Sequence, residues 1–227
     1  MGNSRGVQVW RLTALAAIAW GLFTIVVLHL VSSHDPIHDT LSSYTITDRG
    51  QGMLGASVLS VAIGSLAVLG ALVAGGVSMT FSTKALLILW ALGLATAAVF
   101  PASYPQSPDP VSGEIHLYSC LIAFASLPGA AITMLEPLRG TAERVFLVRW
   151  LRFGLGAVVL FGLSFLFVRL DEAGIPLFHP LTEVLPVGLT QRLTLVANVA
   201  LLFVLLRVAV RTETARAAVL VTSAPRP

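Results

Sequence analysis

Six long apolar segments separate the polar parts of this chain, and they limit its possible folds more than any other feature. The segments cover residues 9–32, 51–77, 84–101, 114–135, 147–170 and 188–210. A helix needs about 20 mostly apolar residues to cross the hydrocarbon core of a bilayer. Because lipid offers backbone groups no hydrogen-bond partner, each crossing segment is expected to be helical. The sequence therefore predicts an all-α, polytopic bundle of six transmembrane helices.

The composition agrees with a chain that lies mostly in lipid. Charged residues make up 11% of the 227 residues, and the mean hydropathy is +0.87. A soluble domain carries about 25% charged residues. The first segment is too long for a cleavable signal peptide and is expected to be an uncleaved span. We predict one transmembrane domain over residues 1–211 and a cytoplasmic, disordered tail over residues 212–227.

Basic residues are concentrated on one side of the predicted bundle. With a cytoplasmic N-terminus, eleven of the 14 lysines and arginines lie inside, and only Arg49, Arg169 and Arg192 lie outside. The positive-inside rule therefore predicts that both termini are cytoplasmic, in a multi-pass protein of the cytoplasmic membrane. Most acidic residues and all five histidines lie at the outer side in this orientation. Polar chemistry is expected on that outer side.

The most polar passage is HDPIHDTLSSY, residues 34–44, directly after the first segment. Asp35 followed by Pro36 is typical of a helix start, which predicts a short interfacial helix over residues 36–43. His34 and His38 have the i, i+4 spacing of two zinc ligands on a helix, and a third ligand would come from Asp39, Glu114 or His116. However, His34 precedes the expected N-cap, and no glutamate lies between the histidines. The pattern is a weak metal signal, and we predict no cofactor.

Polar residues also enter the fourth and sixth segments from the outer side. His116 opens the fourth segment, and Gln191, Arg192, Thr194 and Asn198 occupy the sixth. Polar side chains at membrane depth face other helices or a water-filled cavity, and both alternatives remain open here. If there is an outward-facing polar pocket, we expect Arg192 to supply a fixed positive charge for a lipid headgroup or a small anion. The candidate ligand-binding residues are His38, Asp39, Tyr44, His116, Gln191 and Arg192.

Arg192 leads to a second expectation, about its partner. An unpaired guanidinium is costly in a membrane helix, so it should reach water or an acid. The nearest acids after the first segment and at the start of the fourth are Asp35, Asp39 and Glu114. We predict an ion pair between Arg192 and one of these three.

Small residues form a stripe along the second segment. They recur every three or four positions, at Ser60, Gly64, Ala67, Ala71 and Gly75. Such a stripe lets another helix approach closely. The neighbour is expected within this bundle, although a partner membrane protein is an alternative.

Three groups of residues, in this order, resemble one known family. They are Asp35-Pro36 with Leu41-Ser42-Ser43-Tyr44, Phe100-Pro101 with His116, and Gly188-Leu189 with Gln191-Arg192. Their order and spacing resemble the domain of unknown function 998 family of bacterial and archaeal membrane proteins. That family usually has an acid shortly after the Phe-Pro pair, where this chain has Ala102-Ser103. The resemblance implies a six-helix integral membrane fold and no established activity.

Three functions remain open from the sequence. The first is a non-enzymatic membrane protein whose outward-facing polar pocket binds a lipid headgroup or a small anionic ligand. The second is a metal-assisted hydrolase acting on lipid at the outer leaflet. The third is an accessory subunit of a membrane complex. The sequence does not decide whether the protein is an enzyme.

The sequence contains no nucleophile elbow, phosphate loop, dinucleotide fingerprint or nucleic-acid-binding surface. Its single cysteine, Cys120, excludes an internal disulfide.

Overall fold

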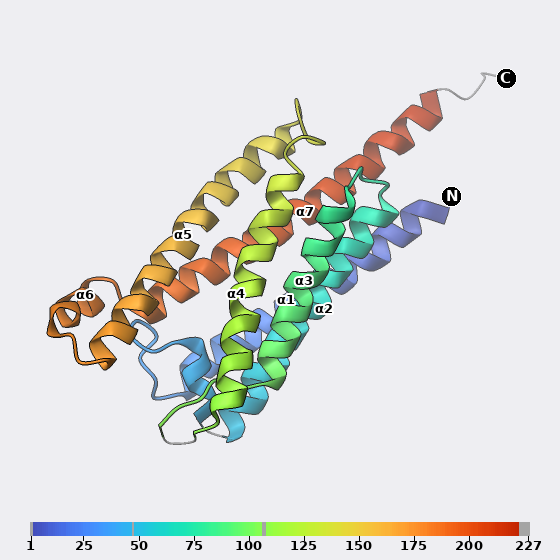
Figure 1. The fold of residues 1–227 in the computed structure, drawn as a ribbon. Helices are drawn as coiled ribbons and strands as arrows, with labels where there is room; N and C mark the ends of the chain where they lie inside the picture. Colours follow the sequence, from blue (N-terminus) through green and yellow to red (C-terminus); the bar gives the residue numbers. More distant parts are fainter. Residues whose placement is uncertain (1, 47, 106–107, 223–227) are drawn as a thin grey trace.

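The computed structural model of the protein describes residues 2–46, 48–105 and 108–222, and these residues fold into helices without strands (Figure 1). Six helices are long and apolar enough to cross a membrane, which confirms the predicted six-span, all-α fold. They are α1 (Gly2–Val31), α2 (Asp48–Ala74), α3 (Phe81–Val99), α4 (Pro110–Thr133), α5 (Ala142–Glu172) and α7 (Val187–Thr222). The short elements are η1 (Leu41–Ile46), η2 (Pro176–Phe178) and α6 (His179–Val184).

The two ends of the bundle differ. Both chain termini lie at one end, which we call the terminal side, and η1, α6 and the α3–α4 connection lie at the other, which we call the loop side (Figure 1). Helix α7 continues to Thr222, so most of the segment expected to be a disordered tail is helical. Residues 223–227 of that predicted tail lie outside the described residues.

Local sequence explains where three of the helices begin. Helices α3, α4 and α5 are capped by the side chains of Thr80, Asp109 and Thr141. Each side chain accepts a hydrogen bond from the backbone N–H of the residue three positions further along the chain. Such caps satisfy backbone N–H groups that have no partner inside the helix. The connection between α4 and α5 turns at Gly140, whose φ of 79° is readily adopted only by glycine. The helix ends are therefore encoded locally.

The small-residue stripe of α2 packs inside this chain. A Cβ atom on Gly64 would come within 2.6 Å of Ile18 in α1, and one on Gly75 would come within 2.8 Å of the Ala209 carbonyl in α7. Ala67 and Ala71 are almost completely buried between these contacts. Close approach to α1 and α7 thus accounts for these four positions of the stripe.

Polar side chains inside the spans link neighbouring helices. The Ser57 hydroxyl of α2 donates to the Gly21 carbonyl of α1 at 2.8 Å. Trp90 Nε1 of α3 donates to the Ser65 hydroxyl of α2 at 2.8 Å. The hydroxyls of Ser164 in α5 and Thr190 in α7 lie 2.7 Å apart. Each pair satisfies groups that lipid would leave without a partner.

The predicted helix over residues 36–43 is wrong. Residues 36–38 form a turn, and the helical segment is the 3₁₀ element η1, several residues later. Asp35 does cap the turn, since its Oδ1 accepts the Ile37 N–H at 2.8 Å. The Asp39 N–H closes the turn by donating to the Asp35 carbonyl at 2.8 Å, and the Asp39 carboxylate accepts the Asp35 N–H at 2.9 Å. The chain leaves helical geometry at Asp39 and Thr40, before η1 begins.

We predict that the terminal side is cytoplasmic, because the basic residues concentrate there. Reporter fusions to a cytoplasm-active protein at the N- and C-termini should be active, and the same reporter inserted after Tyr44 should be inactive. A reporter for the opposite compartment should give the reverse pattern. Activity of that second reporter at the C-terminus would contradict this orientation.

Candidate functional site

Three hydrogen bonds hold the loop after α1 against the start of α7. The Leu41 N–H donates to Gln191 Oε1 at 2.6 Å, and the Leu189 N–H donates to the Ile37 carbonyl at 2.8 Å. Arg192 Nη1 donates to the Asp39 carbonyl at 2.7 Å. Helix α7 thereby positions η1 at the loop side of the bundle.

Arg192 is the centre of this arrangement, but its partners are not the predicted ones. Its Nε donates to His29 Nε2 at 2.8 Å, its Nη1 also donates to the Gly188 carbonyl at 3.0 Å, and its Nη2 lies 3.4 Å from the Tyr44 hydroxyl. Within the described part of the chain, no carboxylate pairs with Arg192. The predicted ion pair with Asp35, Asp39 or Glu114 is therefore wrong.

The carboxylate of Asp39 is not available to Arg192 because it is engaged inside the loop. Its Oδ2 accepts the Asp35 N–H and lies 3.2 Å from His34 Nδ1. The ring of His34 packs edge-on against Tyr44, with ring centroids 5.1 Å apart. The loop therefore presents a backbone carbonyl, rather than an acid, to the arginine.

His29 acts as an acceptor for Arg192. Its Nδ1 lies 2.7 Å from the Ile25 carbonyl, which can only accept a hydrogen bond, so Nδ1 carries the proton. The other ring nitrogen, Nε2, is then free to accept from the guanidinium. Arg192 of α7 thus connects the end of α1, through His29, to the loop, through the Asp39 carbonyl.

His38 lies apart from this group, on the exposed surface. Its Nδ1 is 2.7 Å from Asp35 Oδ2, and its Nε2 is 3.7 Å from Glu183 Oε2 of α6. The hydrogen bond to Asp35 raises the pKa of His38 above its ordinary value, and the same bond lowers the pKa of Asp35. Each partner therefore favours the charged form of the other.

These pKa shifts predict a pH window for the loop. The stabilising contribution of Asp35 is present above pH 3.8 and is lost as pH falls through its lowered pKa. That of His38 is present below pH 6.5 and is lost as pH rises through its raised pKa. We expect the imidazole signal of His38, followed by NMR, to titrate at a lower pH in Asp35→Asn than in the wild type. Glu183→Gln should cause a smaller decrease, and identical titrations in all three proteins would contradict the pairing.

The histidines of the loop do not assemble a metal site. His34 and His38 bind different aspartates, Asp39 and Asp35 respectively. His116 belongs to α4, and its Nδ1 lies near the carbonyls of Ala97 and Phe100. Among the described residues, no three His, Cys, Asp or Glu side chains are placed to hold a metal ion. The hydrolase hypothesis needs four ligands to converge, but they make separate contacts instead. They are His34, His38, Asp39 and His116.

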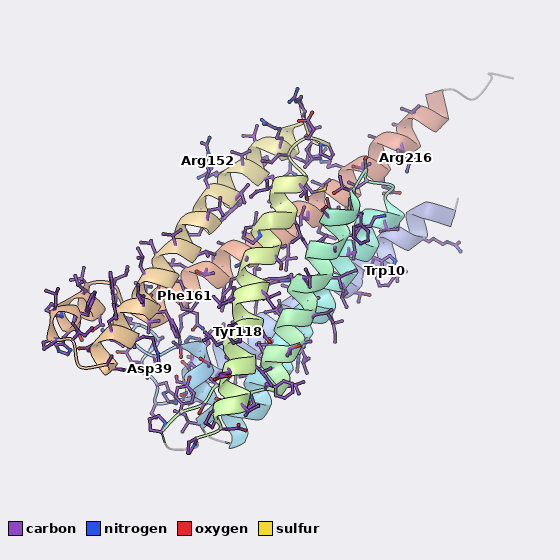
Figure 2. The ribbon with its side chains drawn as sticks, in the orientation of Figure 1. Trp10, Asp39, Tyr118, Arg152, Phe161 and Arg216 are labelled. Atoms are coloured by element: carbon purple, nitrogen blue, oxygen red, sulfur yellow. The ribbon has the colours of Figure 1, made fainter. Side chains whose placement is uncertain are left out.

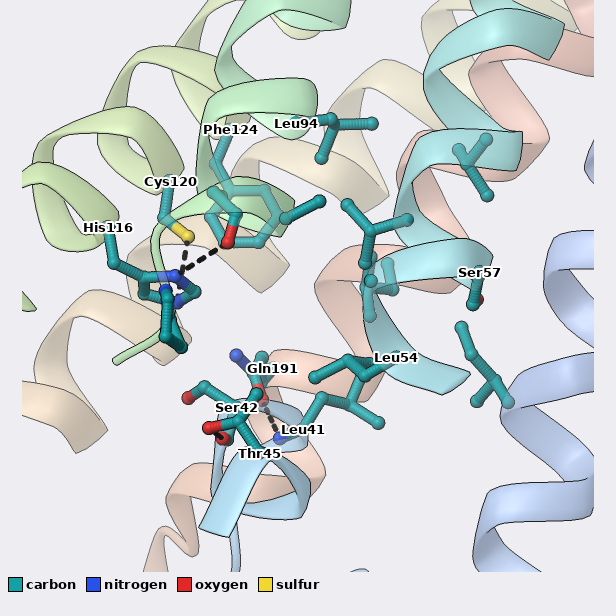
Figure 3. Close-up of a pocket in the computed structure, with 18 of the residues that line it drawn as sticks. Leu41, Ser42, Thr45, Leu54, Ser57, Leu94, His116, Cys120, Phe124 and Gln191 are labelled. Carbon is teal, nitrogen blue, oxygen red and sulfur yellow. Dashed lines mark hydrogen bonds between the residues drawn. The ribbon is translucent and has the colours of Figure 1, made fainter. Parts of the chain in front are cut away.

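A cavity of about 90 Å³ lies beneath η1, between α1, α2, α3, α4 and α7 (Figure 3). Most of its lining is apolar and includes Leu41, Leu54, Leu94 and Phe124. Fully buried Trp90 also lines it. An apolar cavity of about 150 Å³ binds benzene in another protein, so this smaller space has room for an apolar group smaller than benzene.

Two polar groups in the cavity wall have unused hydrogen-bonding capacity. His116 Nδ1 lies 3.0 and 2.9 Å from the carbonyls of Ala97 and Phe100, so Nε2 is an acceptor whose described neighbour is only the weakly donating Cys120 thiol at 3.5 Å. Gln191 uses its oxygen for Leu41, and its amide nitrogen has no partner among the described residues. Figure 3 shows the side chains of His116 and Gln191 on the cavity wall. They offer one acceptor and one donor.

The six candidate ligand-binding residues therefore occupy three places. Only His116 and Gln191 line the cavity. Tyr44, Arg192 and the carbonyl of Asp39 form the contact that holds η1, and His38 is on the surface. Sequence reasoning did not assign a role to His29, Trp90 or Tyr104, whose hydroxyl donates to Ser42 at 3.0 Å. Their spacing carries no signal, because each contact joins distant parts of the chain.

Comparison with known proteins gives a family but no relative with a described activity. A model of the family described as "Protein of unknown function (DUF998)" matches residues 15–208. No curated protein and no solved structure matches the chain. The matched region contains the four middle spans, the larger part of the first and last spans, η1, the Arg192 contacts and the cavity. The chain belongs to the DUF998 family of proteins of unknown function.

Proposed function

We propose that this multi-pass membrane protein binds a small amphipathic molecule in the cavity beneath η1, with an apolar group inside and an uncharged polar end at His116 and Gln191. The observation that carries the proposal is the pairing of a mostly apolar wall with one open acceptor and one open donor. Ligand sites generally combine apolar walls with a few polar groups that fix orientation. A hydroxyl or amide can donate to His116 Nε2 and accept from Gln191 Nε2.

The chemistry of the wall favours an uncharged ligand over the anion first considered. Arg192 does not line the cavity, and it already makes four hydrogen bonds. An anion in this cavity would lose its hydration without meeting a positive charge, which is costly. Arg192 and Tyr44 instead act as positioning residues that keep η1 over the cavity. The site would face the outer leaflet of the cytoplasmic membrane in the predicted orientation.

Neither alternative function gains a supporting observation. A metal-assisted hydrolase needs ligands that converge, and the described histidines and acids do not. An accessory subunit was considered because of the stripe on α2, and α1 and α7 of the same chain cover that stripe. Neither alternative accounts for the apolar cavity or for the open hydrogen-bonding groups of His116 and Gln191, whereas binding of an uncharged amphiphile uses both.

Thermal unfolding of the purified protein tests the proposal with three probes of equal chain length: an alkanol, an alkanoate and an alkylammonium. A ligand that binds only the folded state raises the melting temperature. We expect the alkanol to raise it and the two charged probes not to. Val58→Phe, which places a larger apolar side chain in the cavity wall, should remove the alkanol effect. Equal stabilisation by the alkanol in the wild type and in Val58→Phe would contradict binding in the cavity.

A further inference from the structure

Three arginines share one surface hollow on α5, at the terminal side of the bundle. Arg144, Arg149 and Arg152 line it together with Val145 and Val148, and its volume is about 480 Å³. The hollow is open and is lined by one helix, so a molecule bound there would contact these five side chains and remain exposed on its other side. The N-terminal part of α5, which carries the hollow, lies at the opposite end of the bundle from η1 (Figure 1).

The hollow faces away from the other helices. The side of α5 that packs on the bundle carries buried residues such as Leu147, Leu151 and Gly154. At 100° per residue, Arg149 and Arg152 lie about 100–160° around the helix from the buried leucines. Arg144 lies within about 60° of them, at the edge of the hollow nearest the bundle. All three arginines are exposed, and Figure 2 shows Arg152 projecting outward from α5. In a membrane, this surface faces lipid.

The length of α5 places the arginines at the membrane boundary. Sixteen uncharged residues separate Arg152 from Arg169. The two arginines are therefore about 25 Å apart along the helix, close to the thickness of a hydrocarbon core. Arg152 consequently lies near the level of the phospholipid phosphates on the terminal side, and Arg149 and Arg144 lie at or beyond it.

The charges in the hollow are not neutralised by protein groups. Three other arginines at this end lie near acids: Arg139 pairs with Glu136, and Arg207 and Arg211 lie near Glu143. Arg149 and Arg152 have no acidic partner among the described residues, and Arg144 donates only to the Leu135 carbonyl, at 3.3 Å. Arginine forms strong, paired hydrogen bonds with phosphate oxygens.

We propose that this hollow binds the phosphate-bearing headgroup of an anionic phospholipid in the leaflet on the terminal side. The arginines contact the phosphate, and Val145 and Val148 contact the first part of the acyl chains. Because the site and its ligand differ from those beneath η1, either proposal can fail without the other. Basic pockets on membrane helices at this depth attract anionic lipids.

Spin-labelled lipids in vesicles test the assignment. The full chain is reconstituted in phosphatidylcholine vesicles that contain labelled phosphatidylglycerol or labelled phosphatidylcholine, and the motionally restricted fraction of each label is measured. We expect the wild type to select phosphatidylglycerol, and Arg149→Gln/Arg152→Gln to lower that selectivity by about tenfold, since each arginine near the surface contributes to the attraction. Both positions are exposed, so the variant should unfold at the same temperature as the wild type.

The matched control is Arg139→Gln/Arg216→Gln, which removes the same charge from exposed positions at the same end of the bundle. It should keep the selectivity of the wild type. Equal losses in the two double variants would show general surface attraction and overturn the site. Inorganic phosphate should not displace the label, and displacement by free phosphate would overturn the assignment to a lipid.

Discussion

Replacing Arg192 by glutamine is expected to lower the free energy of unfolding by about 3 kcal/mol, because four hydrogen bonds from one charged group are lost. The substitution leaves His29 Nε2 and the Asp39 carbonyl without their donor in a partly buried position. Hydrogen-deuterium exchange should increase over residues 34–46, since η1 loses a main contact with α7. Arg192→Lys should recover less than half of the loss, because one ammonium cannot reproduce the planar fork of donors.

Arg169→Gln is the control for this prediction. It removes the same charge on the loop side, but Arg169 is exposed, and its one acidic partner among the described residues is the exposed Glu172. Such surface pairs contribute about 0–1 kcal/mol. The account is contradicted if Arg192→Gln and Arg169→Gln lower the free energy of unfolding equally and Arg192→Gln does not increase hydrogen-deuterium exchange over η1. Arg192 would then not position the loop.

Gly188→Ala is expected to lower the free energy of unfolding by about 2 kcal/mol, within the range found for overpacking at a tight contact. A Cβ atom at this position would lie 2.6 Å from the Ile37 carbonyl oxygen and closer still to that of Asp39. Both are backbone atoms, so the loop must move away from α7. The hydrogen bond from Leu189 to Ile37 is then weakened. Thermal unfolding and exchange of the Leu189 amide measure both effects.

Gly156→Ala is the matched substitution in α5. A Cβ atom there has no neighbour within 4 Å among the described residues. Alanine is favoured over glycine inside a helix by about 0.5–1 kcal/mol, so this variant should be as stable as the wild type or slightly more stable. If Gly156→Ala lowers the free energy of unfolding as much as Gly188→Ala does, the effect at Gly188 does not come from the close approach of the loop to α7.

The six spans were predictable because each depends on a local property, the length of an apolar run. The uncharged stretch between Arg152 and Arg169 is an example, since it alone measures one bilayer crossing. The element after α1 was not predictable to the same degree. Asp35-Pro36 does begin a turn, but this turn ends at Asp39 and the helical segment begins only at Leu41. The contacts that hold the loop come from Leu189, Gln191 and Arg192 of α7, and such distant contacts have no periodic pattern.

The sequence predicted which part of the chain forms the site, but not which atoms contact one another there. Arg192 does connect α7 to the loop after α1, as the sequence suggested, but through the carbonyl of Asp39 instead of its carboxylate. The spacing of residues cannot distinguish these two oxygens. Likewise, Gln191 and Arg192 are adjacent in sequence, yet Gln191 lines the cavity while Arg192 contacts His29 in α1. Only the rotation of α7 separates their roles.

The proposed cavity site makes Trp90 a natural reporter. Trp90 is fully buried from the surrounding membrane and lines the cavity. A bromoalkanol quenches tryptophan fluorescence on contact, so quenching of Trp90 requires the probe to enter the cavity. A variant that retains only Trp90 isolates this signal, and a variant that retains only Trp20, which is 59% exposed, reports probe dissolved in lipid.

Quenching of Trp90 by a series of bromoalkanols is therefore the most direct test of the central claim. We predict saturable quenching that Val58→Phe abolishes and that Gln191→Leu weakens by about fivefold, the effect of one lost hydrogen bond. Bromoalkyl phosphates of the same lengths should quench Trp20 but not Trp90. If bromoalkanols quench Trp20 and leave Trp90 unchanged, no ligand enters the cavity and the proposed function is wrong.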